Sequence, residues 1–248
     1  FNGAFIDTGV VGTYNVLRAA TVCKIDKVIN VSSVSAYGII SEMDKPLTED
    51  MVGKQYLHYG VTKHSTEEYC KMFKDTFGLD TTSLRLFYAY GERYSSLDHS
   101  ALVIFVNRAL NGEDLLIRGS GNQLRDYTYI SDVVDGIIKS VDGKGGGEVY
   151  NISGGGNCSI LELAEKVRKI VNPNVDIKYQ SQSEYKYCDE YVKIPCGLTK
   201  KDKNGKWIDE RNLIADTSKA FNDFGYEASV SIDIGIKKMY KWLLNKRG

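Results

Sequence analysis

The sequence has 248 residues, of which 42% are hydrophobic and 26% are charged, and its 32 basic side chains balance its 32 acidic ones. This length and composition are typical of a globular chain that builds a substantial core in one or two domains. The zero net charge argues against a broad nucleic-acid-binding face, and no apolar run approaches the roughly 20 residues that span a membrane. The five cysteines are scattered without a C-x-x-C pair, so we expect a cytoplasmic protein with reduced thiols and no metal site.

The chain is predicted to open with a helix over residues 1–24, with Thr8 as a candidate N-cap. Its apolar residues recur near a 3.6-residue period at Val10, Val11, Tyr14, Leu17 and Ala20. Lys27–Val31 then has the composition of a short buried parallel strand, because it is rich in β-branched residues and lacks turn residues. Ser32 and Ser33 follow at its carboxyl end, where open α/β sheets bind their ligands.

Tyr59 and Lys63 stand four residues apart at the start of a predicted helix over 62–77, which ends at Gly78. That spacing puts both side chains on one helix face. A tyrosine that acts as a base near pH 7 needs its pKa lowered by roughly three units from about 10, or ~4 kcal/mol. An ammonium about 4 Å away supplies roughly that much at an effective dielectric of about 20. The pair therefore suits proton abstraction from a sugar or alcohol hydroxyl, although an isolated match is more often a surface tyrosine packed on a lysine stem.

The remaining sequence alternates between predicted strands and helices. The strands are predicted at 81–90, 115–118, 148–152 and 175–179. The helices are predicted at 100–111, 131–141, 159–171, 217–224 and 232–245. Ser159 and Glu162 form a capping box at the start of one of them. Residues 180–211 are predicted to be an irregular charged stretch with a solvated hairpin at 200–206.

The segment Ser32–Gly38 resembles the Ser-Ser-x-x-x-Tyr-Gly block of the extended short-chain dehydrogenase/reductases, the NAD-dependent nucleotide-sugar epimerase/dehydratase family. Further family motifs follow in the family's order at Tyr59–Lys63, Leu84–Gly91, Gly119–Tyr127, Asp132–Val134, Glu148–Ile152 and Ala215–Ala220. The resemblance implies an α/β fold with a doubly wound, Rossmann-like parallel sheet and a smaller α/β substrate-binding lobe. We expect residues 1–91 to be the remaining part of the dinucleotide-binding domain. Residues 92–248 would be the substrate-binding lobe, with about 128–153 returning to the first domain.

The family places strand, glycine turn and helix units before the first helix, and the glycine turn holds the dinucleotide pyrophosphate. No G-x-x-G-x-x-G motif after a strand occurs in this sequence. We therefore expect the chain to be the latter part of such an enzyme, truncated by on the order of 70 residues. By itself it would bind dinucleotide poorly. Supply of the missing part by another polypeptide is the alternative.

The resemblance also implies a role for each matching residue. Tyr59 would be the catalytic base, and Lys63 would bind the nicotinamide ribose and keep the phenol ionised. Ser33 would hydrogen-bond the reacting sugar oxygen, unless it is only a strand-end residue that caps a backbone group. Phe87 is assigned to the cofactor side. The cofactor is NAD, with NADP as the alternative.

On the substrate side, Arg125 matches an arginine that meets the nucleotide diphosphate, where a guanidinium fork suits paired phosphate oxygens. A buried pair with Asp126 or Asp132 is its structural alternative. Arg211 is a second phosphate candidate. Tyr88 stands beside the sugar nucleotide, where the family has asparagine.

Other departures from the family bear on the reaction. The dehydratases place an acidic pair directly after the hydroxyl residue, but Val34 and Ser35 stand there in this sequence and neither can act as acid or base. This favours epimerisation over dehydration. Gly9 replaces a family asparagine, which weakens a cofactor-side contact, and Glu92 replaces a proline.

We predict an NAD-dependent epimerase of a nucleotide sugar, of the UDP-hexose 4-epimerase type, which works through a keto intermediate. The alternatives are a dehydratase, decarboxylase or reductase of the same family, or a non-catalytic binding relative. We expect a homodimer formed through the helices near 10–20 and 62–77, and no nucleic-acid or membrane partner. Apolar surface for the dimer is expected from Val61, Tyr69, Cys70 and Phe73.

Overall fold

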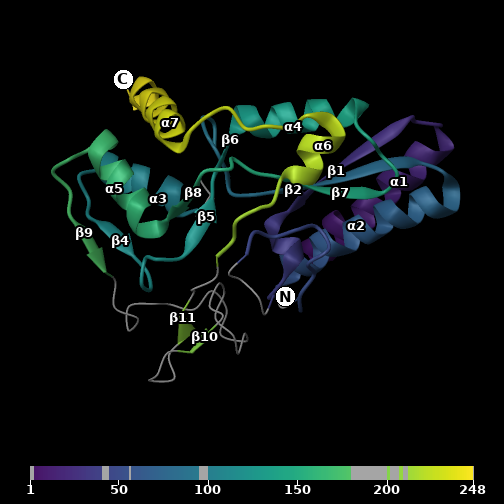
Figure 1. The fold of residues 1–248 in the computed structure, drawn as a ribbon, viewed down its shortest axis with the longest axis horizontal. Helices are drawn as coiled ribbons and strands as arrows, with labels where there is room; N and C mark the ends of the chain where they lie inside the picture. Colours follow the sequence, from purple (N-terminus) through teal and green to yellow (C-terminus); the bar gives the residue numbers. More distant parts are fainter. Residues whose placement is uncertain are drawn as a thin grey trace.

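The computed structural model describes residues 3–40, 45–55, 57–94, 100–179, 200–201, 207–208 and 212–247 of the chain. It has two lobes that lie side by side (Figure 1). The lobe on the right in this view holds a parallel sheet with helices on both faces. The lobe on the left is mostly helical, with short strands at its edges.

The sheet consists of β1 (Lys27–Ser33), β2 (Asp80–Leu86) and β7 (Glu148–Ile152), all parallel and in the order β1-β2-β7. Ser33 pairs with Leu86, and Leu86 with Ile152, so the three strands end in register at one edge. The helix α2 (His58–Phe77) connects β1 to β2 on one side of the sheet, and α4 (Ile130–Asp142) precedes β7 on the other (Figure 1). This confirms the predicted doubly wound α/β class.

The first helix changes its winding along its length. Its first part, η1 (Phe5–Val11), is a π-helix, and α1 (Gly12–Val22) continues it as an α-helix. The prediction of Thr8 as N-cap is wrong, because Thr8 lies inside the π-helical segment. A Cβ atom at Gly9 would lie 2.2 Å from Cγ2 of Thr62 in α2. This close approach leaves no room for the asparagine that the family motif has at this position.

The interface between α1, α2 and the sheet is apolar. Its buried members are Leu17, Ala20, Cys70, Phe73 and Leu79. Cys70 and Phe73 therefore offer no surface to a partner chain, contrary to the expectation from the sequence. The outward-facing apolar side chains of the two helices include Val16, Val61 and Phe77, which are 58%, 46% and 54% exposed.

The second lobe surrounds a large apolar core. Its helices are α3 (Ala101–Leu110), α5 (Ile160–Val171) and α7 (Ile232–Arg247). A parallel pair joins β4 (Leu115–Ile117) and β9 (Ile177–Tyr179), and an antiparallel pair joins β5 (Leu124–Asp126) and β8 (Asn157–Ser159). The predicted capping box opens α5, with the Ser159 and Glu162 side chains bonded to each other's backbone amides.

Short elements connect the lobes and complete the described chain. A parallel pair of two-residue strands, β3 (Ala89–Tyr90) and β6 (Thr128–Tyr129), lies between them, and α6 (Ser218–Phe224) packs near α4. The turn η2 (Val34–Tyr37) follows β1. Near the predicted hairpin, β10 (Lys200–Lys201) pairs with β11 (Trp207–Ile208) in antiparallel fashion. The division of the chain into two domains stays a prediction.

No helix among the residues that the structure describes combines the length and the apolar character that a membrane span needs.

Candidate active site

Ser33 lies at the carboxyl edge of the sheet and begins the turn η2. It has extended backbone angles, and its Oγ accepts a hydrogen bond from the amide of Ser35 at 3.2 Å. The capping role that the sequence offered as an alternative is therefore present. A hydroxyl has one donor and two acceptor positions, so the cap still leaves its proton for a ligand oxygen.

The first turn of α2 lies directly against η2. A Cβ atom at Gly60 would lie 2.7 Å from the carbonyl oxygen of Ser35. The Gln55 amide donates to the carbonyl of Ala36 at 2.5 Å, which fixes the segment before α2 on the same turn. Tyr59 precedes Gly60 and is 41% exposed. Its ring therefore lies at the surface, where its centroid is 6.2 Å from that of the Phe5 ring in η1.

Lys63 lies one helical turn after Tyr59, and its Nζ atom is 5.7 Å from the centroid of the Tyr59 ring. The same ammonium donates to the carbonyl of Val31 in β1 at 2.6 Å. Burial lowers the pKa of Lys63, and the Glu67 carboxylate raises it in part. The structure thus brings the Lys63 ammonium against β1, two residues before Ser33, and the convergence of Tyr59 with Ser33 stays a prediction.

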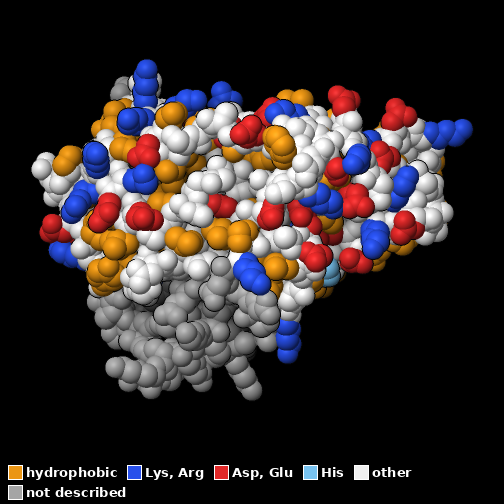
Figure 2. All heavy atoms as spheres, in the orientation of Figure 1, with side chains coloured by type: hydrophobic (Ala, Val, Ile, Leu, Met, Phe, Trp, Pro, Cys, Tyr) orange, Lys and Arg blue, Asp and Glu red, His pale blue; other side chains and the backbone are white. Residues whose placement is uncertain are grey.

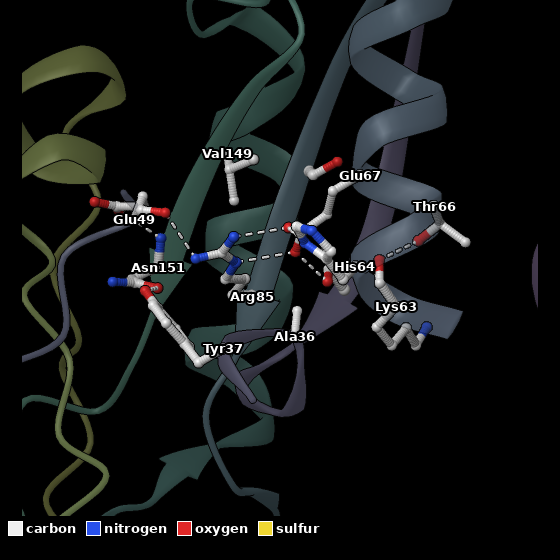
Figure 3. Close-up of polar contacts among 12 residues, drawn as sticks. Ala36, Tyr37, Glu49, Lys63, His64, Thr66, Glu67, Arg85, Val149 and Asn151 are labelled. Carbon is white, nitrogen blue, oxygen red and sulfur yellow. Dashed lines mark hydrogen bonds and ion pairs between the residues drawn. The ribbon is translucent and has the colours of Figure 1, made fainter. Parts of the chain in front are cut away.

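A buried polar network joins α2 to the sheet and to the turn η2 (Figure 3). The Glu67 carboxylate accepts from Nε and Nη2 of Arg85 at 3.0 and 2.8 Å, and from Oγ of Ser32 at 2.5 Å. The Tyr37 hydroxyl donates to Oδ1 of Asn151 at 2.7 Å. Burial by itself lowers the pKa of Arg85, but the hydrogen bonds and charge of Glu67 raise it by more, so the guanidinium stays charged.

Sequence reasoning missed Glu67 and Arg85. Glu67 continues the spacing of Tyr59 and Lys63 by four residues, and Arg85 is a charged residue inside a strand that is otherwise buried. Those two signals were available, but neither shows by itself that the two side chains pair.

Phe87 and Tyr88 follow β2 at the same edge of the sheet. Phe87 is fully buried with its ring centroid 6.2 Å from that of Tyr37, its amide donates to Ile152 and its carbonyl accepts from Thr128. The ring of Phe87 is therefore part of the core, and the assignment of this residue to the cofactor side stays a prediction.

Tyr88 has a φ of +33°, which is unusual for a residue with a large side chain. It packs between the core of the second lobe and the cluster around Tyr37. Its ring lies 5.8 Å from Cζ of Arg125, so Tyr88 connects the sheet edge to the predicted phosphate-binding arginine. Backbone strain of this kind is common at functional sites.

Arg125 is 5% exposed and its Nη1 donates to the carbonyl of Leu124 at 2.9 Å. The two aspartates proposed as its alternative partners bind other groups. Asp126 accepts from the amide of Ala215, and Asp132 accepts from the hydroxyl of Ser229 and the amide of Val230. Arg211, the second phosphate candidate, lies outside the described residues.

Within the described part of the chain, no three histidine, cysteine, aspartate or glutamate side chains are grouped so that they could hold a metal ion.

Comparison with known proteins agrees with this geometry. Residues 2–153 match the model of the NAD dependent epimerase/dehydratase family. The UDP-N-acetyl-alpha-D-glucosaminuronate decarboxylase of Bacillus cytotoxicus is 30% identical over 247 residues, which cover 96% of this chain and 69% of that protein.

Two solved structures share both sequence and fold with the chain. The UDP-glucose 4-epimerase of Thermotoga maritima, solved with UDP-glucose, is 27% identical with a TM-score of 0.79, over 97% of this chain and 71% of that one. The UDP-glucuronic acid 4-epimerase of Bacillus cereus, solved with NAD, is 26% identical with a TM-score of 0.80, over 100% and 72%. These findings confirm the predicted enzyme class and cofactor, and the chain belongs to the NAD-dependent epimerase/dehydratase family.

Proposed function

We propose that this member of the family is a 4-epimerase of a UDP-hexose or of its N-acetyl form, which works through a 4-keto intermediate. The observation that supports the proposal is that the first turn of α2, which carries Tyr59, packs against the turn that Ser33 begins, while Lys63 contacts β1 near its carboxyl end. An exposed phenol, an ammonium and a hydroxyl at one sheet edge are the groups needed to remove and return the proton of a sugar hydroxyl.

Tyr59 takes the proton of the sugar 4-hydroxyl and returns it when the ketone is reduced. The Ser33 hydroxyl, which still has its proton to donate, hydrogen-bonds the same sugar oxygen and polarises it. The Lys63 ammonium lies 5.7 Å from the centroid of the Tyr59 ring, so it would hold the nicotinamide ribose beside the phenol.

The residues at the sheet edge fit the nicotinamide end of NAD. Lys63 has three N–H donors, and its bond to Val31 uses one, so the others can meet ribose hydroxyls. Tyr59 is exposed beside it and would share that contact. When bound, NAD supplies the hydride chemistry that oxidises the sugar carbon and reduces it again.

The nucleotide part of the substrate would bind near Tyr88 and Arg125. Their contact at 5.8 Å places an aromatic face beside a guanidinium, a combination that suits a base or sugar ring next to a diphosphate. Arg211 is proposed as a second diphosphate ligand on the resemblance alone.

Decarboxylation of a UDP-hexuronic acid is the second candidate, because the Bacillus cytotoxicus relative is named for that type of reaction. Dehydration is disfavoured, since Val34 and Ser35 stand where an acidic pair would be needed. Oxidation at C4 is common to these reactions, so Tyr59, Lys63 and Ser33 keep the same roles in each.

We also propose a cytoplasmic homodimer that forms through α1 and α2. The exposed side chains Val16, Val61 and Phe77 support this, because two copies could bury them together in a two-fold interface. Acidic and basic side chains are interspersed on the face in Figure 2, which favours a small-molecule substrate over nucleic acid.

The test is an assay with NAD and a panel of UDP-sugars on the protein expressed from its full coding sequence, so that a glycine-turn unit encoded before Phe1 is included. The panel contains the gluco and galacto forms of the hexose, the N-acetylhexosamine and the hexuronic acid, and products are separated by chromatography. The proposal predicts interconversion of one gluco/galacto pair. Release of a pentose nucleotide from the hexuronic acid would favour the decarboxylase. Binding of the nucleotides without any turnover would favour a non-catalytic relative.

A further inference from the structure

The ion pair between Glu67 and Arg85 is almost completely shielded from solvent, with 3% and 2% of the residues exposed. Both carboxylate oxygens of Glu67 accept hydrogen bonds from the Arg85 guanidinium, which gives a strong bidentate ion pair. Burying two charges costs desolvation energy that their attraction only partly recovers. An apolar pair of similar size would often give the folded protein the same stability, so stability alone does not account for this ion pair.

On its α2 side, the pair holds the helix that carries Tyr59 and Lys63. Glu67 is four residues after Lys63 and eight after Tyr59, so the three side chains share one helix face. The Ser32 hydroxyl donates to the Glu67 carboxylate at 2.5 Å. Ser32 directly precedes Ser33, so this bond links the helix of the proposed base to the strand of the proposed hydroxyl donor.

On its β2 side, the pair holds the turn that Ser33 begins. Arg85 pairs with Ser32 in the sheet, and its guanidinium lies 4.3 Å from the ring centroid of Tyr37, the last residue of η2 (Figure 3). Its Nη1 also donates to the carbonyl of Glu49 at 2.9 Å. One guanidinium therefore contacts both the end of this turn and the carboxylate that anchors α2.

We propose that Glu67 and Arg85 are positioning residues, which set the placement of Ser33 relative to Tyr59 and Lys63. Neither would touch substrate or cofactor, because both are buried beneath the sheet edge. The loss of kcat expected from this inference rests on the proposed function, whereas the expected change in the position of Tyr59 does not.

The first variant is Glu67→Gln. The glutamine side chain has the same size and can still accept a hydrogen bond from Ser32, but it lacks the negative charge that accepts two hydrogen bonds from the Arg85 guanidinium. The second is the double variant Glu67→Leu with Arg85→Met, an apolar pair of similar volume. The control is Asp132→Asn, because Asp132 is also a buried, hydrogen-bonded carboxylate but binds Ser229 and Val230 away from the sheet edge.

Three measurements are made on each variant, introduced into the protein expressed from its full coding sequence. Thermal unfolding reports stability, and kcat and KM of the epimerisation report catalysis. The 19F resonance of 3-fluorotyrosine incorporated at position 59 reports the surroundings of the proposed base, and it requires no turnover.

Positioning predicts that Glu67→Gln shifts the 19F resonance and lowers kcat by up to about 100-fold with little change in KM, as expected for an error in placement of about 1 Å. The apolar pair should unfold within a few degrees of wild type yet show the same loss of kcat. Asp132→Asn should lower the unfolding temperature and leave the 19F resonance and kcat unchanged.

The inference is overturned if the 19F resonance in Glu67→Gln matches that of wild type, or if kcat of the apolar pair is that of wild type. If the pair fails to fold, Glu67→Gln alone decides. If wild type turns over none of the UDP-sugars, the proposed function fails, and the 19F resonance still decides whether Glu67 and Arg85 position Tyr59.

Discussion

The interiors of the two lobes are built from different chemistry. The interior of the sheet lobe contains many polar and charged side chains, among them Ser32, Thr66, Glu67, Thr82 and Arg85. The core of the second lobe around α3, α5 and α7 is made of aliphatic and aromatic side chains, and the buried polar residues Gln123, Arg125 and Asp126 lie at or next to its strand β5. Apolar contacts are non-directional, whereas hydrogen bonds fix distances and angles. The comparison suggests that the sheet lobe uses its interior to place the active-site groups, and that the second lobe uses its core mainly for cohesion.

The largest expected effect is a loss of kcat on substitution of Tyr59, the proposed base at the surface of the sheet lobe. Tyr59→Phe removes the proton acceptor and almost no contact area, so kcat should fall by about 10²- to 10⁴-fold while the affinity for the sugar nucleotide changes little. Product chromatography and calorimetric titration with UDP would measure the two quantities. Turnover at the wild-type rate would show that Tyr59 is not the base.

In the second lobe we expect the opposite pattern, a loss of stability without a loss of catalysis. Leu163 is fully buried in α5, and Leu163→Ala should lower the free energy of unfolding by about 2–5 kcal/mol through lost burial and a residual cavity. Leu244→Ala in α7 is the control, because Leu244 is 47% exposed and its loss should cost less than about 0.5 kcal/mol. Urea unfolding and kcat measured on the same samples would test the pattern. A fall in kcat as large as that of Tyr59→Phe would break the distinction between the lobes.

The sequence predicts the elements of both lobes wherever a periodic pattern is long. The helix over 159–171 has an apolar stripe and a capping box, and the structure has α5 there with that box. The two-residue strands β3 and β6 were not predicted separately, because strands this short form only through tertiary pairing and leave no periodic signal. The π-helical winding of η1 is likewise outside what apolar spacing can show.

In the candidate site, too, residues in local motifs are predictable from the sequence, whereas contacts between distant segments are not. Ser33, Tyr59 and Lys63 are predictable because each lies in a local motif with a chemical reason for its spacing. The pairing of Glu67 with Arg85 joins residues 18 apart on a helix and a strand, and only the docking of α2 on the sheet brings them together. Phe87 shows the converse limit, since a motif match does not indicate that its ring is buried in the core.

The third prediction tests whether the polar interior also responds to pH. Burial raises the pKa of Tyr37 to about 12, with the charge of Arg85 opposing it. Because the folded pKa is above the unfolded value of about 10, the neutral phenol stabilises the fold below pH ~10, and that contribution disappears as the pH rises toward 12. At about 1.4 kcal/mol per pKa unit, the loss is about 3 kcal/mol.

Tyr37→Phe removes this contribution and leaves Oδ1 of Asn151 without the hydroxyl donor. Near pH 9 the variant should be less stable than wild type by about 1–3 kcal/mol. As the pH rises toward 12, the gap between the two proteins should narrow, because only wild type loses stability from ionisation of this phenol. Urea unfolding at a series of pH values measures the gap. A gap that stays constant across the series would show that Tyr37 does not titrate with the fold.

The smallest effect is expected at a surface ion pair of the second lobe, which serves as the counterpart of Glu67 and Arg85. Nζ of Lys166 in α5 lies 2.8 Å from Oδ2 of Asp233 in α7, and the two side chains are 35% and 46% exposed. Water and salt screen such a pair, so a double-mutant cycle with Lys166→Met and Asp233→Asn should give a coupling of about 0.2–1 kcal/mol that weakens in high salt. Removing one partner of the buried pair should instead cost about 3–5 kcal/mol, because the remaining charge stays desolvated. The same cycle on Glu67→Leu and Arg85→Met should therefore give a coupling well above about 1 kcal/mol, and a coupling equal to that of the surface pair would show that burial does not distinguish the two pairs.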